Sequence, residues 1–160
     1  METFLSSLIN FLLLAQDSRD KAVRYRACQL ISKIFESMDE EATISEELAE
    51  KILTTMMGRL CDKIPVVRCQ AICSLSRLQD PLDPQCPVVS SYIHLMSSDA
   101  SADVRRTVLF NIAITTQTLP HIIGKGQKFI ILKIFFQLSH KLISCNKLMN
   151  VKHFIYRENS

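Results

Sequence analysis

Cysteine and histidine are the residues of this sequence that could bind a metal ion. Cys69 and Cys73 lie four residues apart, so they share one face of a helix, and Cys61 and His94 could approach them. A structural zinc site needs four converging ligands, usually including two cysteines separated by two to four residues in a loop. Most of the six cysteines instead fall in apolar helical patterns, where cysteine commonly packs in the core. We predict reduced, buried thiols of an intracellular protein, with no metal and no cofactor.

Catalytic motifs are absent from the sequence. It contains no glycine-rich phosphate loop, no G-x-S-x-G and no H-E-x-x-H, and its four histidines have no paired motif around them. We therefore predict that the chain is not an enzyme.

Basic side chains gather near the starts of three expected helices, and they form the candidate binding site. They are Arg24, Arg26, Lys63, Arg68, Arg105 and Arg106. In a repeat array, equivalent positions line up, so such residues could form a ridge that contacts phosphates without reading bases. Two other interpretations stand beside this one. The arginines that follow a valine could pair with an acidic turn of a neighbouring repeat, and the other three residues could form an ordinary solvated face.

A recurring sequence pattern, an acidic turn followed by Val-Arg, positions these residues. Val-Arg pairs begin at residues 23, 67 and 104, so successive pairs lie 44 and 37 residues apart, and an acidic turn precedes each pair. A period near 40 residues is typical of helical hairpins of the HEAT or armadillo kind. The aspartates suit the unpaired amides and positive dipole at a helix start, and Pro65 needs no amide hydrogen there. We expect each valine of the pairs to point into its hairpin.

Apolar periodicity predicts three helical hairpins. They pair residues 3–16 with 21–38, 45–60 with 65–79, and 88–97 with 103–116. In the first helix we expect a stripe of Phe4, Leu8, Phe11 and Ala15, widened by Leu5, Ile9 and Leu12. Residues 43–46 have the spacing of a capping box. Leu119-Pro120 is expected to stop the pattern. The prediction is an all-α HEAT-repeat solenoid of about three hairpins.

Composition and charge agree with a helical body and a different tail. The chain of 160 residues is 48% hydrophobic, with 3 glycines, 5 prolines and no tryptophan, which suits helices. Residues 1–124 carry 12 basic and 15 acidic side chains, whereas residues 125–160 carry seven basic and one acidic. The net charge of +3 therefore belongs to the tail. It gives no evidence that the body binds nucleic acid.

The repeat signature ends near Gly124. The next Val-Arg pair would fall at residues 141–148, which read KLISCNKL, and the preceding segment 129–143 is strongly apolar but interrupted by Lys133. Ten to twelve apolar residues are too few for a bilayer span, so we expect no membrane association, although a membrane-attached protein using this segment is an alternative. We predict a HEAT array over residues 1–124 and a divergent, poorly ordered or loosely helical tail over 125–160.

Several runs closely resemble the condensin G-subunit (condensin complex subunit 3) family. They are AVRYRACQLISKIFESM, DKIPVVRCQAICSLSRLQDP, CPVVSSY, DVRRTVLFNIA and TLPHIIGK, in the family's order over roughly residues 17–125. The resemblance implies the N-terminal part of a longer HEAT solenoid that binds the kleisin subunit and, with it, holds double-stranded DNA in mitotic chromosome condensation.

The resemblance also implies a place of action and an origin for the tail. It implies a protein of the nucleus, chromosome and cytoplasm. Because residues 1–124 have a net charge of −3 and only a ridge is basic, we predict weak, sequence-independent contact with double-stranded DNA. Because the tail is unlike the family, we hypothesise a truncated or alternatively spliced product, or a predicted gene that runs into non-coding sequence. A generic HEAT interaction scaffold unrelated to chromosomes is the alternative function.

Overall fold

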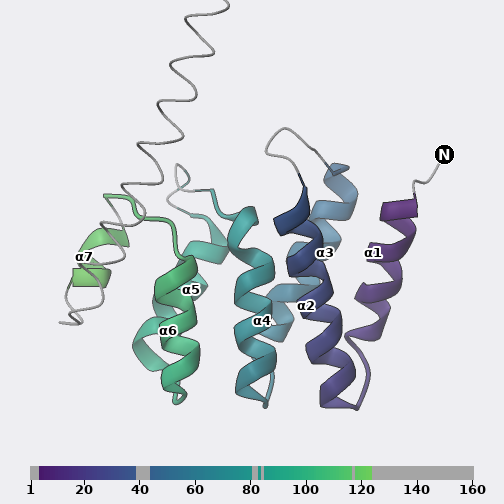
Figure 1. Ribbon diagram of the computed structural model, residues 1–160. Helices are drawn as coiled ribbons and strands as arrows, with labels where there is room; N and C mark the ends of the chain where they lie inside the picture. Colours follow the sequence, from purple (N-terminus) through teal and green to yellow (C-terminus); the bar gives the residue numbers. More distant parts are fainter. Residues whose placement is uncertain (1–3, 39–43, 81–82, 84, 117, 124–160) are drawn as a thin grey trace, which may run out of the picture. The chain divides into compact units, whose positions relative to one another are not determined.

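The structure is a computed structural model that describes residues 4–38, 44–80, 83, 85–116 and 118–123 (Figure 1). Every regular element in these residues is helical. In chain order they are α1 (Phe4–Ala15), α2 (Lys21–Ser37), α3 (Glu46–Arg59), α4 (Pro65–Leu75), a 3₁₀ turn (Ser76–Leu78), α5 (Pro87–Ser98), α6 (Ala102–Asn111) and α7 (Thr118–Ile123). The chain divides into compact units 1–119 and 120–160, and the first contains α1 to α6.

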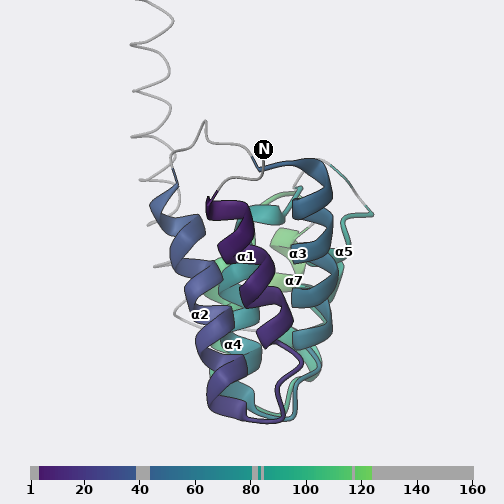
Figure 2. The ribbon, with the colours of Figure 1, turned by 90° about the vertical axis from the view of Figure 1, so that its right-hand side faces the viewer.

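Three helical hairpins build the first unit. α1 packs on α2, α3 on α4 and α5 on α6, and α4 also packs on both α2 and α6. The second helices of the hairpins, which carry the Val-Arg pairs, therefore form a row in the order α2, α4, α6 and run in the same direction (Figures 1 and 2). This arrangement confirms the predicted array of HEAT-repeat-like hairpins.

The core lies between the two helices of each hairpin and between neighbouring second helices. Apolar side chains with no solvent exposure include Ile31, Ile52, Ile72 and Val108. Burying a side chain of this size contributes about 1.5–3 kcal/mol. Ser74 Oγ donates a hydrogen bond of 2.8 Å to the Cys28 carbonyl of α2, so α2 and α4 approach closely at this point.

The interior faces of the first hairpin differ from the expected stripes. α1 buries Ile9 and Leu12, whereas Phe4 and Phe11 are 84% and 67% exposed. The predicted centre of the stripe was wrong, but the buried residues Ile9 and Leu12 belong to its predicted widening. α1 is apolar on nearly every side, so periodicity alone could not choose its inner face. Val23 is 40% exposed, although the equivalent valines of α4 and α6 are fully buried. Among the described helices, α2 is the first of its row, so no preceding second helix covers it.

Two helix ends also differ from expectation. α6 ends at Asn111 rather than at residue 116, because the side chain of Gln79 binds the backbone there. Gln79 Nε2 donates to the Asn111 carbonyl and its Oε1 accepts from the Ala113 amide, both at 2.8 Å. Pro120 does not stop the pattern but lies in the first turn of α7, where a helix needs no amide hydrogen.

The start of α3 is capped differently from the expected box. Ser45 is the N-cap, and its hydroxyl accepts from the Leu48 amide at 3.4 Å. Thr43 lies outside the described residues, as does the tail beyond Ile123.

Candidate nucleic-acid interface

The turns that lead into α2, α4 and α6 share one backbone geometry. In Ser18, Asp62 and Asp99 a side-chain oxygen accepts the amide hydrogen of the residue two positions later, at 3.2, 2.9 and 2.8 Å. Each lies six residues before the arginine of its Val-Arg pair. Asp20 has a different position and function: it is the N-cap of α2 and accepts from the Ala22 amide at 2.8 Å. Ser18, not Asp20, is therefore the repeat equivalent of Asp62.

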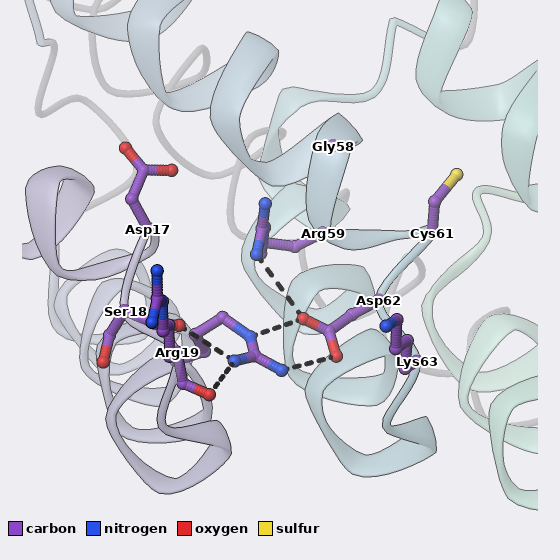
Figure 3. Close-up of a pocket in the computed structure, with 9 residues that line it drawn as sticks. Asp17, Ser18, Arg19, Gly58, Arg59, Cys61, Asp62 and Lys63 are labelled. Carbon is purple, nitrogen blue, oxygen red and sulfur yellow. Dashed lines mark hydrogen bonds and ion pairs between the residues drawn. The ribbon is translucent and has the colours of Figure 1, made fainter.

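Arg24 links the first turn to the second. Its Nε and Nη2 donate to the two carboxylate oxygens of Asp62 at 2.6 and 3.1 Å, and its Nη1 donates to the Ser18 carbonyl at 2.9 Å (Figure 3). Arg59, at the end of α3, places its Nη1 3.5 Å from the same carboxylate. The Asp62 side chain is only 3% exposed. Asp62 is thus a buried carboxylate held by two guanidinium groups.

Arg68 repeats the arrangement between the second and third turns. Its Nε and Nη2 both lie 2.8 Å from the carboxylate of Asp99, and its Nη1 donates to the Asp62 carbonyl at 2.7 Å. These contacts confirm that the arginines of the first two Val-Arg pairs reach an acidic turn of the next repeat. We call the pairs Arg24–Asp62 and Arg68–Asp99 the arginine–aspartate ladder. Arg105 donates to the Asp99 carbonyl of its own turn at 2.6 Å.

Burial and hydrogen bonding act in opposite directions on the two ladder carboxylates. Burial disfavours the charge of Asp62, but the hydrogen bonds from Arg24 and the Ile64 amide outweigh it, so the pKa of Asp62 lies below its usual value. The pKa of Asp99 is lowered in the same way, against burial, by Arg68 and the Ser101 amide. Both carboxylates are therefore ionised throughout the physiological pH range.

The remaining predicted site residues are solvent-exposed and hold three different positions in their repeats. Arg26 donates to Gln29 Oε1 at 2.6 Å, and its guanidinium lies 5.6 Å from the ring centre of Tyr25. Arg106, whose side chain is 62% exposed, pairs with Asp103 at 3.0 Å. Lys63 is exposed in the turn before α4. These three cations therefore do not form a line of equivalent positions, which the idea of a repeat-related ridge had assumed.

Three of the described thiols are poor metal ligands and nucleophiles, whereas Cys61 is exposed, so the prediction of buried thiols is wrong for that residue. Burial raises the pKa of Cys28 to about 12 and also raises the pKa values of Cys69 and Cys73, which keeps the thiols protonated. Cys73 faces α6, where Asn111 Nδ2 approaches its sulfur at 3.9 Å. Within the described residues no three His, Cys, Asp or Glu side chains converge as a metal site would require.

An open cleft of about 440 Å³ lies beside the first rung of the ladder, and we call it the turn cleft (Figure 3). One side comes from the turn between α1 and α2, and the other from the end of α3 and the turn after it. Its lining residues are Asp17, Ser18, Arg19, Arg24, Gly58, Arg59, Cys61, Asp62 and Lys63. Sequence reasoning missed Arg19 and Arg59. Arg19 could have been found, because it lies five residues before Arg24, as Lys63 does before Arg68.

Stacked helical hairpins with an inter-turn ladder define the class: a HEAT-repeat-like array. No family model matches the sequence. Condensin complex subunit 3 of Xenopus laevis is 47% identical over 118 residues, which is 74% of this chain and 11% of the relative. The human protein of the same name is 46% identical over 136 residues, covering 84% of this chain and 13% of the relative.

A solved structure agrees with these relatives. The crystal structure of the Schizosaccharomyces pombe condensin Cnd3–Cnd2 subcomplex contains a chain with a TM-score of 0.69 and 31% identity, covering 79% of this chain and 16% of the other. The resemblance to condensin complex subunit 3 is therefore confirmed over most of this chain. The chain spans 11% of the length of the Xenopus relative and 13% of the length of the human one.

The membrane alternative rests on residues 129–143, which lie outside the described part of the chain. No helix among the described residues is both long enough and apolar enough to cross a bilayer.

Proposed function

We propose that this chain acts as a non-catalytic HEAT-repeat segment of condensin that binds the kleisin subunit and, through it, joins the rest of the complex. One observation carries the proposal: the fold and sequence match one chain of the Cnd3–Cnd2 subcomplex, in which Cnd2 is the kleisin. Its site of action would be the nucleus, the chromosome and the cytoplasm, in mitotic chromosome condensation. A repeat array of this kind contributes a rigid surface rather than a reaction centre.

The kleisin proposal is tested by co-expression of this chain with the kleisin of its own organism. We expect the kleisin to co-purify with the chain. A full-length condensin subunit 3 from the same organism, prepared in parallel, serves as the positive control. If the full-length subunit captures the kleisin and this chain does not, the chain is better described as a generic HEAT interaction scaffold.

The second part of the proposal is weak, sequence-independent contact with double-stranded DNA. The candidates are Arg26, Lys63 and Arg106, because their charged ends are exposed, whereas Arg24 and Arg68 are engaged in the ladder. Arg105 donates through Nη1 to the carbonyls of Asp99 and Ala100 and belongs to neither ladder pair, so it stays a candidate as well. The net charge of −3 over residues 1–124 keeps the affinity low.

The salt dependence of DNA affinity tests this contact. Each phosphate contact adds about 0.9 to the slope of log K against log salt. Changing Arg26, Lys63 and Arg106 together to alanine should flatten the slope by up to about three times that amount. A control with the same charge change is the triple alanine variant at Lys21, Lys33 and Lys51. If the two variants have equal slopes, the three candidates do not contact phosphate and are ordinary solvent-exposed residues.

We further propose that the repeat array ends near Gly124 and that residues 125–160 form a separate, loosely structured tail. Support comes from the sequence, where the Val-Arg signature stops and the charge becomes basic.

A further inference from the structure

The charged side chains that line the turn cleft are mainly basic, and one of them has a buried donor without an acceptor. Four of its lining side chains are basic and two are acidic, and one of these acids, Asp62, is already neutralised by Arg24. Arg19 and Lys63 are exposed at the two sides of the cleft, and Arg59 lines it from the end of α3. The local charge is therefore positive, although the net charge over residues 1–124 is negative.

Two buried nitrogen atoms have no hydrogen-bond acceptor among the described residues, one on a residue that lines the cleft and one on a neighbour that does not line it. They are Arg59 Nε and Gln16 Nε2. Gln16 is fully buried, and Arg59 Nη1 donates to the Gln16 carbonyl at 3.1 Å, so the two residues are in direct contact. A buried donor without an acceptor costs about 1–3 kcal/mol. The Arg59 side chain is 26% exposed, so an oxygen-rich anion in the cleft would meet the exposed part of its guanidinium, whereas Gln16 lies behind it.

Repeat geometry places the exposed cations of the cleft in register. Arg19 and Lys63 each follow the residue whose side chain closes the turn, Ser18 and Asp62, and each lies five residues before a ladder arginine. In the third turn the equivalent residue is Ala100. The paired cations thus occur only at the first two turns of the described array, which are the two turns that form the cleft.

We propose that the turn cleft binds a phosphate group, with Arg19 and Lys63 contacting the oxyanion from both sides and Arg59 donating to it from α3. The DNA backbone and free inorganic phosphate offer the same chemistry. The DNA source rests on the proposed function, whereas binding of inorganic phosphate does not depend on it. Asp17 is the opposing charge, because it lines the cleft and no ion pair is found for it among the described residues.

The test is a titration of the full chain with inorganic phosphate near neutral pH and constant ionic strength, followed by amide NMR shifts at residues 18, 19 and 63. We expect saturable shifts. One unit charge at contact distance in water-like surroundings changes affinity about fivefold, so Arg19→Ala with Lys63→Ala should weaken binding by at least tenfold. The opposite change, Asp17→Asn, should tighten it up to about fivefold.

The control is Lys21→Ala with Lys33→Ala, which removes the same charge outside the cleft and should leave phosphate binding within twofold. All these side chains are exposed, so thermal unfolding should be unchanged. A parallel titration with a short DNA duplex identifies the source. If the cleft variants weaken the binding of both ligands, the bound phosphate group comes from the DNA backbone. If they weaken the binding of inorganic phosphate alone, the ligand is free phosphate.

Two results overturn the proposal. One is the absence of saturable shifts at the cleft amides. The other is equal affinity of the cleft variant, the Asp17→Asn variant and the control for both ligands. Neither result bears on kleisin capture, which tests the proposed function separately.

Discussion

Replacing Asp62 by asparagine should destabilise the array more than any exposed charge change does. Asp62 accepts from Arg24 Nε at 2.6 Å, from Arg24 Nη2 at 3.1 Å and from the Ile64 amide at 2.9 Å. Asparagine retains one carbonyl oxygen for the turn but loses the negative charge and one acceptor. Its amide hydrogens would then face the guanidinium of Arg24, which has no acceptor to offer.

The magnitude follows from the burial of the pair. The Arg24 and Asp62 side chains are 12% and 3% exposed, so the energy of the ion pair lies between that of an exposed pair and that of a fully buried one. A hydrogen bond to a charged group is worth about 1.5–3 kcal/mol, and we expect Asp62→Asn to cost about 2 kcal/mol. Asp62→Ala also breaks the turn and leaves Arg24 without its carboxylate, so it should cost about 3–5 kcal/mol.

Urea unfolding of the full chain, followed by far-UV circular dichroism, measures these costs as shifts in midpoint at constant slope. The matched control is Glu36→Gln, which breaks an ion pair with Lys33 whose side chains are 57% and 67% exposed. Exposed pairs contribute about 0–1 kcal/mol. A double-mutant cycle between Arg24→Ala and Asp62→Ala isolates the coupling. The reasoning fails if Asp62→Asn costs no more than Glu36→Gln, or if the cycle shows no coupling.

Three further predictions concern pH, a buried hydroxyl and the tail. The pKa values of Asp62 and Asp99 are lowered in the folded state, so the stabilisation by their charges is complete above about pH 4, the pKa of aspartate in the unfolded chain. It is lost as the pH falls through their folded-state pKa values. An Asp62→Asn/Asp99→Asn double variant should therefore lose less stability on acidification, which acid unfolding curves measure. Tyr92→Phe removes the hydrogen bond that its hydroxyl donates to the Ile72 carbonyl and should cost about 1 kcal/mol in urea unfolding, whereas no change would mean that the carbonyl finds another donor. Ending the chain at Gly124 should keep or raise soluble yield, because the segment 129–143 is apolar; unfolding of residues 1–124 in that truncation would instead make the tail part of the fold.

The repeat period and the helix starts were predictable because they depend on local chemistry. Aspartate in a turn, proline at a first helical turn and a 3.6-residue apolar period act within one segment, so each can be recognised in sequence. Their recurrence at 44 and 37 residues predicted the row of second helices, and the structure has that row. The acidic turn of a neighbouring repeat was one of two predicted partners for Arg68, the other being a phosphate, and the structure pairs it with Asp99.

The inner face of α1 and the end of α6 were not predictable, because distant residues decide them. α1 is apolar on most sides, and its inner face is set by which sides α2 and α3 cover. The end of α6 is set by Gln79, which lies 32 residues before Asn111 in sequence and binds its carbonyl. Neither effect leaves a local signature. The same is true of the turn cleft, whose two sides come from different hairpins.

The ladder also explains why repeat signals are a poor guide to phosphate-binding residues in this array. An arginine recurs at a repeat position because packing requires it, and its donors are then occupied: Arg24 uses Nε, Nη1 and Nη2 within the protein. Such a guanidinium could bind a phosphate only by releasing a buried carboxylate, which costs more than an exposed contact returns. Cations available to a ligand must therefore lie beside the ladder rather than in it. Arg19 and Lys63 satisfy this condition, since they recur with the turns and have exposed side chains.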